Sequence, residues 1–189
     1  MLTRERLPSA ARRLQARRDG SVAGCLQRLA DLHFQPRMQI GIISDTHGLL
    51  RPEALTALRD SDYIIHAGDI GAPEILARLA AIAPLTPIRG NVDREPWSRE
   101  IAAVNILEVG DLSIYVLHNL AELDLKPEAA GFAAVVSGHS HVPRMETKNG
   151  VLYFNPGSAG PRRFKLPVTV GRLTVEGPSV RGEIFEIVG

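Results

Sequence analysis

The sequence predicts an α/β fold in which two β-sheets pack as a sandwich flanked by helices. Strand and helix patterns alternate between residues 38 and 89, which is typical of a parallel sheet. Residues 101–189 instead contain three hairpin signals, which favour antiparallel strands. The 189 residues, of which 44% are hydrophobic, are enough for one domain with a substantial core.

The first half of the domain reads as three short apolar strands joined by two helices. The expected strands are 38–44, 63–66 and 85–89, and the expected helices run from Pro52 toward Arg59 and from Pro73 through Ala83. Proline suits the first turn of a helix, where its missing N–H leaves no bond unmade. The order strand–helix–strand–helix–strand predicts parallel pairing with right-handed crossovers.

The second half is expected to form a mostly antiparallel second sheet that packs on the first. Strands 101–109 and 112–118 flank the turn Gly110-Asp111, and further hairpins turn at Asn149-Gly150 and Gly177-Pro178. A short helix at 126–130 leads into a strand at 132–137.

The charge distribution places a boundary near Arg37. Residues 1–37 carry a net charge of +5, whereas residues 38–189 carry −4. We therefore expect a basic N-terminal extension, 1–37, that is weakly ordered or reflects a mis-assigned start, and a domain at 38–189. Met38, just before the first strand, is a credible alternative start. An organellar transit peptide and a nucleic-acid-binding arm are less favoured interpretations of the extension.

Composition limits the cellular setting and the partners. No apolar run approaches the roughly 20 residues that cross a bilayer, so no membrane partner is expected. The net charge of +1 gives no reason to expect nucleic acid. A single cysteine, Cys25, excludes an intramolecular disulfide and fits a cytoplasmic location. A homo-oligomer is compatible with the sequence, which does not set the oligomeric state.

Polar side chains follow the apolar strands at the points where the strands end. These candidates are Asp45 and His47, His66 and Asp69, Asn91 and Asp93, His118, and His139 with His141. Ligands of open α/β sheets bind beyond the carboxyl ends of the strands, so the clusters are expected to build one pocket. Imidazole and carboxylate together suit Mn²⁺, Fe²⁺, Zn²⁺ and similar ions. Each cluster alone is weak evidence for a metal site. His66 is expected to support the site without binding metal.

The order of these clusters carries a family resemblance. Asp45-x-His47, Gly68-Asp69, Gly90-Asn91, His118 and Gly138-His139-x-His141 occur in the order found in calcineurin-like metallophosphoesterases. Residues 38–189 resemble the small members of that superfamily, which include YfcE-like phosphodiesterases. The resemblance implies the αββα architecture of the family and leaves residues 1–37 unexplained.

The resemblance also implies a site for two divalent cations. The first would be held by Asp45, His47, Asp69 and His141, and the second by Asp69, Asn91, His118 and His139, with Asp69 as the bridge. Mn²⁺ is the leading expectation, with Fe, Ni or Zn as alternatives. The implied reaction is attack on a small phosphate ester by a hydroxide between the ions, with diesters favoured over monoesters. Asp69, Asn91 and His139 would act in catalysis by positioning metal and phosphate.

This sequence departs from the family pattern at two positions. Many relatives have a histidine after Gly-Asn that protonates the leaving oxygen, and Val92 stands there in this chain. Asn119 follows His118 where relatives commonly have glycine. Asp93 is expected to orient a ligand or a bound water, and Arg94 is either a phosphate contact or an exposed side chain. Asp93 and His66 are the first alternatives as proton donors.

Two other functions remain open from the sequence. The retromer subunit Vps29 resembles this fold and acts chiefly in protein binding with an incomplete ligand set, so a non-catalytic scaffold is the main alternative. No ligand position of this chain is replaced by a non-ligating residue, which favours the enzyme. A nuclease is disfavoured because residues 38–189 are net acidic, whereas a surface that tracks phosphates should be basic.

Overall fold

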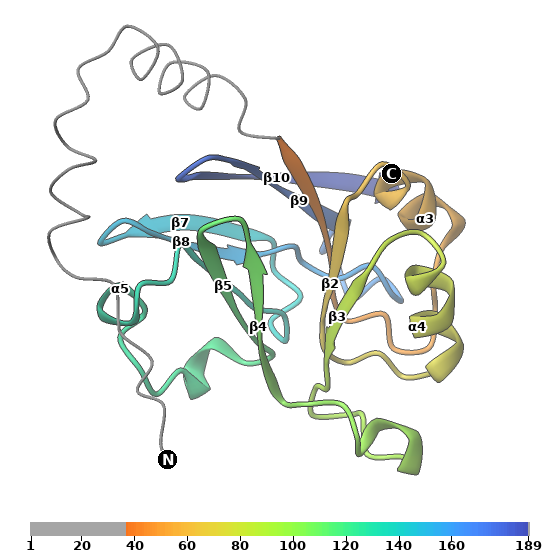
Figure 1. The fold of residues 1–189 in the computed structure, drawn as a ribbon. Coiled ribbons are helices and arrows are strands. Elements are labelled where there is room, and N and C mark those ends of the chain that lie inside the picture. Colours follow the sequence, from red (N-terminus) through yellow and green to blue (C-terminus); the bar gives the residue numbers. More distant parts are fainter. Residues whose placement is uncertain (1–36, 189) are drawn as a thin grey trace, which may run out of the picture. The chain divides into compact units, whose positions relative to one another are not determined.

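The computed structural model describes residues 37–188, which form two five-stranded sheets with few helices (Figure 1). The basic segment 1–36, with Cys25, lies outside the described residues, and so do the interpretations that rest on it. The two strand orders are β10-β9-β1-β2-β3 and β4-β5-β6-β8-β7. Within the described residues, no helix is long and apolar enough to cross a bilayer.

The first sheet contains the predicted parallel unit. Its strands β1 (Met38–Ile43), β2 (Tyr63–Ala67) and β3 (Leu85–Ile88) are joined by α3 (Pro52–Leu58) and α4 (Pro73–Ala80). β2 pairs in parallel with both β1 and β3, which confirms the expected alternation. Both helices begin at the predicted prolines. The first ends next to Arg59, as expected, and the second ends three residues before the expected Ala83.

The second sheet is mixed, so the prediction that it is mostly antiparallel was wrong. Its strands are β4 (Val104–Val109), β5 (Leu112–Leu117), β6 (Ala134–Val136), β7 (Arg144–Lys148) and β8 (Val151–Asn155). β4 and β7 pair antiparallel with their neighbours, whereas β6 is parallel to both β5 and β8. The connection between β5 and β6 contains η2 (Leu120–Glu122) and α5 (Pro127–Ala130), and it is long enough for a parallel crossover.

The C-terminal hairpin belongs to the first sheet and not, as expected, to the second. Its strands are β9 (Val168–Glu176) and β10 (Ser179–Val188), and β9 pairs antiparallel with β1, with Leu173 opposite Ile40. This pairing covers the edge of β1 that β2 leaves free. A strand edge with unpaired N–H and C=O groups is otherwise open to association with another chain.

Apolar residues fill the space between the sheets and the space under the helices. Ile40 and Ile42 of β1 face the second sheet and pack in one cluster with residues such as Ile114 and Phe154. Ile43, at the end of β1, belongs instead to a cluster with Leu58 and the other inward residues of α3 and α4. Full burial of each such side chain contributes about 1.5–3 kcal/mol. The helices therefore cover the outer face of the first sheet, as Figure 1 shows.

The parallel pairing of β5 with β6 matters for the site. Parallel neighbours end at the same edge of a sheet, so the residues that follow β5 and β6 lie side by side. The backbone N–H of Gly138, after β6, donates to the carbonyl oxygen of His118, after β5, at 3.0 Å. An antiparallel arrangement would have placed these two residues at opposite edges.

Candidate metal centre

Three of the predicted ligands bring their donor atoms together at the end of β1. Nε2 of His141 lies 3.3 Å from Oδ1 of Asp45 and 3.3 Å from Nε2 of His47. Nε2 of His47 lies 3.9 Å from the same Asp45 oxygen. The two imidazole rings stack with their centroids 5.1 Å apart, although the residues are far apart in the sequence.

The other predicted ligands form a second group next to the first. Oδ1 of Asn91, after β3, lies 3.2 Å from Nε2 of His118 and 3.0 Å from Nδ1 of His139. Nε2 of His118 lies 3.4 Å from Oδ2 of Asp69. This second group therefore combines one carboxylate, one amide oxygen and two imidazoles.

Asp69 lies between the two groups. Its Oδ2 is 3.4 Å from Nε2 of His118 on one side and 3.8 Å from Nε2 of His47 on the other. Its Oδ1 accepts a hydrogen bond of 3.0 Å from the backbone N–H of Val92, which fixes the carboxylate. The structure thus brings all seven predicted ligand residues together, with Asp69 in the central position.

The backbone at this edge has an unusual conformation. Five of the seven candidate ligands have a positive φ, between 46° and 68°: Asp45, His47, Asp69, His139 and His141. Non-glycine residues rarely adopt this region, and such strain, of order 1–3 kcal/mol each, concentrates at functional sites. Among the other non-glycine residues that the structure describes, only Asn149 and Phe164 have a positive φ. The strain falls on the residues that the sequence singled out for metal binding.

Two glycines allow the loops to approach each other. A Cβ atom at Gly90 would overlap the backbone N and carboxylate of Asp69, and one at Gly138 would overlap the Ser44 hydroxyl. Any side chain at either position would therefore displace a candidate ligand or its supporting loop.

Asp45 is buried with one oxygen free. Oδ2 accepts hydrogen bonds from the Ser44 hydroxyl at 2.6 Å and the His139 backbone N–H at 3.1 Å. Oδ1 is buried and has no hydrogen-bond partner among the described residues. Burial raises the pKa of Asp45 from 3.8 to about 6, and the hydrogen bond from Ser44 and the nearby His118 offset this effect only in part.

At neutral pH most of the other candidate ligands whose pKa is shifted carry no proton on the atom that would bind a cation. Burial lowers the pKa of His47, and burial together with Arg163 lowers that of His141 to about 4, so both imidazoles are neutral. Burial is the largest single influence on Asp69 and on His118 and opposes ionisation of both, but the hydrogen bond between them, backbone hydrogen bonds to Val92 and Ala67, and neighbouring charges together outweigh it. The pKa of Asp69 is therefore lowered and that of His118 is raised.

This donor set fits divalent cations. Ligands bound at about 2.0–2.2 Å to one ion lie roughly 3–3.5 Å from each other, which is close to the separations found here. Asp45, His47 and His141 form one potential group, and Asp45, Asp69 and His118 form another. The unpartnered Oδ1 of Asp45 is the kind of buried acceptor that a cation would satisfy.

Comparison with known proteins identifies the family. Residues 38–177 match the family model of the calcineurin-like phosphoesterase superfamily domain. This chain belongs to the calcineurin-like phosphoesterase superfamily. It is 32% identical over 160 residues to a probable metallophosphoesterase of Methanothermobacter thermautotrophicus, covering 78% of this chain and 92% of that protein. The family resemblance inferred from the ordered clusters is thereby confirmed.

Two solved structures share the fold of this chain. A structurally and functionally characterised archaeal phosphodiesterase aligns with a TM-score of 0.66 and 25% identity, over 78% of this chain and all of that one. Vps29 of Cryptosporidium parvum aligns with a TM-score of 0.65 and 16% identity, over 80% and 98% of the two chains. The second likeness shows a common fold alone.

Asp93 and His66 lie behind the candidate metal ligands. Oδ2 of Asp93 accepts from the backbone N–H groups of Ile70 and Gly90 at 3.0 and 2.8 Å, and Oδ1 accepts from that of Gly71 at 2.9 Å. The Asp93 carboxylate therefore joins the loops after β2 and β3. His66 is fully buried, its Nε2 lies 2.9 Å from the Thr46 hydroxyl, and burial lowers its pKa to about 4.

The residues that depart from the family pattern lie at the rim of the site. Val92 is 45% exposed and directly follows the candidate ligand Asn91. Asn119 begins η2, where its side chain accepts a hydrogen bond of 3.1 Å from the Ala121 N–H. Nε of Arg94 donates to the carbonyl oxygen of Asn91 at 3.0 Å. Arg94 thus contacts the backbone of a ligand loop.

Arg163 also reaches the candidate site, although it was not predicted to. Its Nη2 lies 3.4 Å from Nε2 of His47, and Arg163 belongs to the exposed part, 161–165, of the loop that links β8 to β9. The only signal in the sequence was its place after another strand end, in the run Arg162-Arg163-Phe164-Lys165.

Two cavities flank the second group of ligands. One of about 280 Å³ is bordered by Asn91, His118 and His139, with Tyr115 and Val104 farther from the ligands. The other, of about 370 Å³, is bordered by His139, Ser140, Val142, Leu120 and Arg144.

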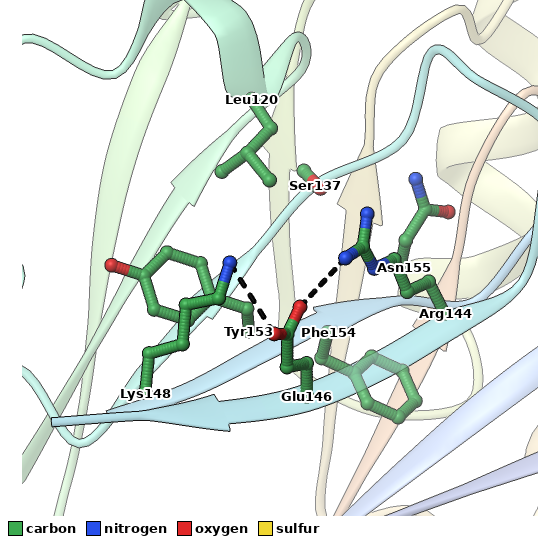
Figure 2. Close-up of a pocket in the computed structure, with 8 residues that line it drawn as sticks. All are labelled: Leu120, Ser137, Arg144, Glu146, Lys148, Tyr153, Phe154 and Asn155. Carbon is green, nitrogen blue, oxygen red and sulfur yellow. Dashed lines mark hydrogen bonds and ion pairs between the residues drawn. The ribbon is translucent and has the colours of Figure 1, made fainter. Parts of the chain in front are cut away.

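The second cavity adjoins a smaller pocket over β7 and β8 (Figure 2), with which it shares Leu120 and Arg144. In this pocket Glu146 lies between Arg144, at 2.7 Å, and Lys148, at 3.3 Å. The charges that line the pocket are therefore already paired with one another.

Proposed function

We propose that this protein hydrolyses phosphodiesters with two divalent cations held by Asp45, His47, Asp69, Asn91, His118, His139 and His141. The observation that carries the proposal is the central position of Asp69 Oδ2, within 4 Å of donor atoms from both groups. A carboxylate so placed is suited to bridge two ions, and family membership makes a phosphate ester the expected substrate.

Different residues of the chain would hold the two ions. When bound, the cations supply a water molecule activated as hydroxide and neutralise charge at phosphorus. Asp45, His47 and His141 would hold the first ion, and Asn91, His118 and His139 the second. The Ala67 carbonyl oxygen lies 2.7 Å from Nδ1 of His118 and would accept a hydrogen bond from the Nδ1–H, which leaves the Nε2 lone pair for metal.

The space beside the proposed ligands favours phosphodiesters over phosphomonoesters as substrates. A diester has two ester arms, and two cavities, of about 280 and 370 Å³, both border His139. A monoester would occupy one of them. The similar archaeal protein described as a phosphodiesterase agrees with this choice.

Protonation of the leaving oxygen sets the substrate range. Val92 cannot donate a proton, and the two alternatives inferred from the sequence are poorly placed. Asp93 is 5% exposed and bonded to three backbone N–H groups, and His66 is fully buried. We therefore expect this enzyme to prefer substrates whose leaving group needs little protonation.

A Vps29-like scaffold is the alternative function. The likeness to Vps29 rests on the fold, which enzymes and scaffolds of this superfamily share. The complete donor set and its strained backbone favour hydrolysis, because a scaffold has no need of either.

The test is a metal-dependence assay on the full chain. Protein stripped with a chelator should be inactive, and added Mn²⁺ should restore cleavage of bis(p-nitrophenyl) phosphate. Fe²⁺, Ni²⁺ and Zn²⁺ are assayed in parallel, with p-nitrophenyl phosphate as the monoester control. Equal inactivity on every ester with every metal would reject the enzyme and favour the scaffold.

A further inference from the structure

The loop between β8 and β9 brings a guanidinium group to the edge of the metal centre. Nη2 of Arg163 lies 3.4 Å from Nε2 of His47, which in turn lies 3.3 Å from Nε2 of His141. The Arg163 side chain is exposed, and no carboxylate of residues 37–188 lies within ion-pairing distance of it. Its charge is therefore not used in a structural ion pair within this part of the chain.

The start of this loop is tied to the backbone that carries the first group of ligands. The N–H of Ala159 donates to the Ser44 carbonyl oxygen at 3.0 Å, and the Ser158 hydroxyl donates to the Asp45 carbonyl oxygen at 3.0 Å. Arg51, at the start of α3, donates through Nε and Nη2 to the Gly160 carbonyl oxygen, each at 3.3 Å. These bonds place the loop, and with it Arg163, relative to Asp45 and His47.

The contact between Arg163 and His47 cannot persist once a cation is bound. The Nε2 lone pair that accepts from Arg163 is the one that His47 would give to the metal. A guanidinium next to a divalent cation is also repelled by it. An anion that lies between the two removes the repulsion, and a phosphate presents oxygen atoms that match the guanidinium fork.

We propose that Arg163 binds non-bridging oxygens of the phosphate group of the substrate, an inference that rests on the proposed function of the site. The neighbouring residue offers a matched comparison. Nη2 of Arg162 donates to the carbonyl oxygen of Val188 in β10 at 2.9 Å, so the same charge on the same loop is directed elsewhere.

Phosphate binding tests this proposal without turnover. Inorganic phosphate is titrated calorimetrically into the Mn²⁺-loaded full chain, with R163Q, R163K and R162Q as variants. R163Q should weaken phosphate binding about 10- to 100-fold, as expected for the loss of one charge-assisted contact. R163K should retain part of the affinity, and R162Q should match the wild type. The KM for bis(p-nitrophenyl) phosphate should rise in R163Q, with a smaller change in kcat.

Three outcomes would overturn the assignment. R163Q could bind phosphate as tightly as the wild type, R162Q could lose as much affinity as R163Q, or R163Q could lose bound Mn²⁺. The last result would mean that Arg163 supports the ligand cluster instead of the substrate. A wild type that binds phosphate through Arg163 but cleaves no ester would instead reject the proposed function and leave the contact standing.

Discussion

Nε2 of His118 lies 3.4 Å from Oδ2 of Asp69, and this pair joins the loop after β2 of one sheet to the end of β5 in the other. The two pKa values move in opposite directions: that of Asp69 is lowered and that of His118 is raised. In the metal-free protein the pair is therefore held partly as an ion pair. A cation that binds both side chains must displace the proton from His118.

Binding of metal should consequently release protons near neutral pH. Because the pKa of His118 lies above 6.5, a larger fraction than usual is protonated at pH 7. Affinity for Mn²⁺ should fall as pH decreases through this pKa and again near 6, where Asp45 takes up a proton. Calorimetric titration in buffers with different ionisation enthalpies measures the released protons. An apparent heat that is the same in all buffers at pH 7 would contradict this coupling.

Replacing Asp45 with asparagine should stabilise the metal-free protein. A folded-state pKa of about 6, against 3.8, means that the native state holds its proton more tightly than the unfolded state. Asp45 therefore destabilises the fold progressively as pH rises from about 4 to 6, by roughly 3 kcal/mol at pH 8. Thermal unfolding with chelator should show D45N as more stable than wild type at pH 8 and similar at pH 4. With Mn²⁺ present, the order should reverse.

Metal content should distinguish the roles of three residues. D69A should lose both ions, because Asp69 is the proposed bridge, whereas H118A should chiefly lose the second. H66A should keep both, since His66 contacts Thr46 and none of the donor atoms in the ligand groups. Elemental analysis after dialysis gives the number of bound ions, and the diester assay gives activity. Full metal occupancy in D69A would rule out the bridge.

A histidine at position 92 should restore a proton donor. Val92 is exposed at the rim, so the larger side chain has room, and a general acid contributes about 10²–10⁴-fold when the leaving group is poor. V92H should therefore accelerate cleavage of alkyl esters far more than that of p-nitrophenyl esters. An equal gain on both substrates would point to better folding or metal loading. Efficient alkyl-ester cleavage by the wild type would show that another group donates the proton.

The N-terminal extension should be dispensable for hydrolysis. The family match begins at residue 38, and the first core strand begins at Met38. We expect a chain that starts at Met38 to keep its metal content, diester activity and unfolding temperature. All three quantities are measured for the shortened chain and for the full chain in the same buffer. A fall of more than a few degrees in unfolding temperature would show that residues 1–37 contribute to the stability of the domain.

The first sheet could be predicted because its information is local. Each of its parallel strands is a short apolar run, and each helix between them begins with a proline. The C-terminal hairpin was predicted as a hairpin but assigned to the wrong sheet. Its turn at Gly177 is specified by neighbouring residues, whereas the pairing of Leu173 with Ile40 depends on which strand edge remains open in the folded domain.

The candidate ligands could be predicted for a similar reason, since each follows a recognisable strand. Arg163 could not, because its approach to His47 depends on the course of a loop with no periodic pattern. The contacts of Asp93 with the loops after β2 and β3 could not be predicted from the sequence either. The Asp93 carboxylate accepts hydrogen bonds from backbone N–H groups, which every non-proline residue has. Such contacts therefore do not depend on the side chains of the two loops and cannot be inferred from them.

The pairing of β1 with β9 bears on the order in which a ribosome makes this chain. Asp45 and His47 leave the ribosome early, but their turn is held by Ser158 and Ala159, and β1 gains its second neighbour only with residues 168–176. Domains of this size fold as units once enough of the chain has emerged. The nascent protein therefore carries the proposed ligands Asp45 and His47 through most of translation before the rest of the candidate site can form.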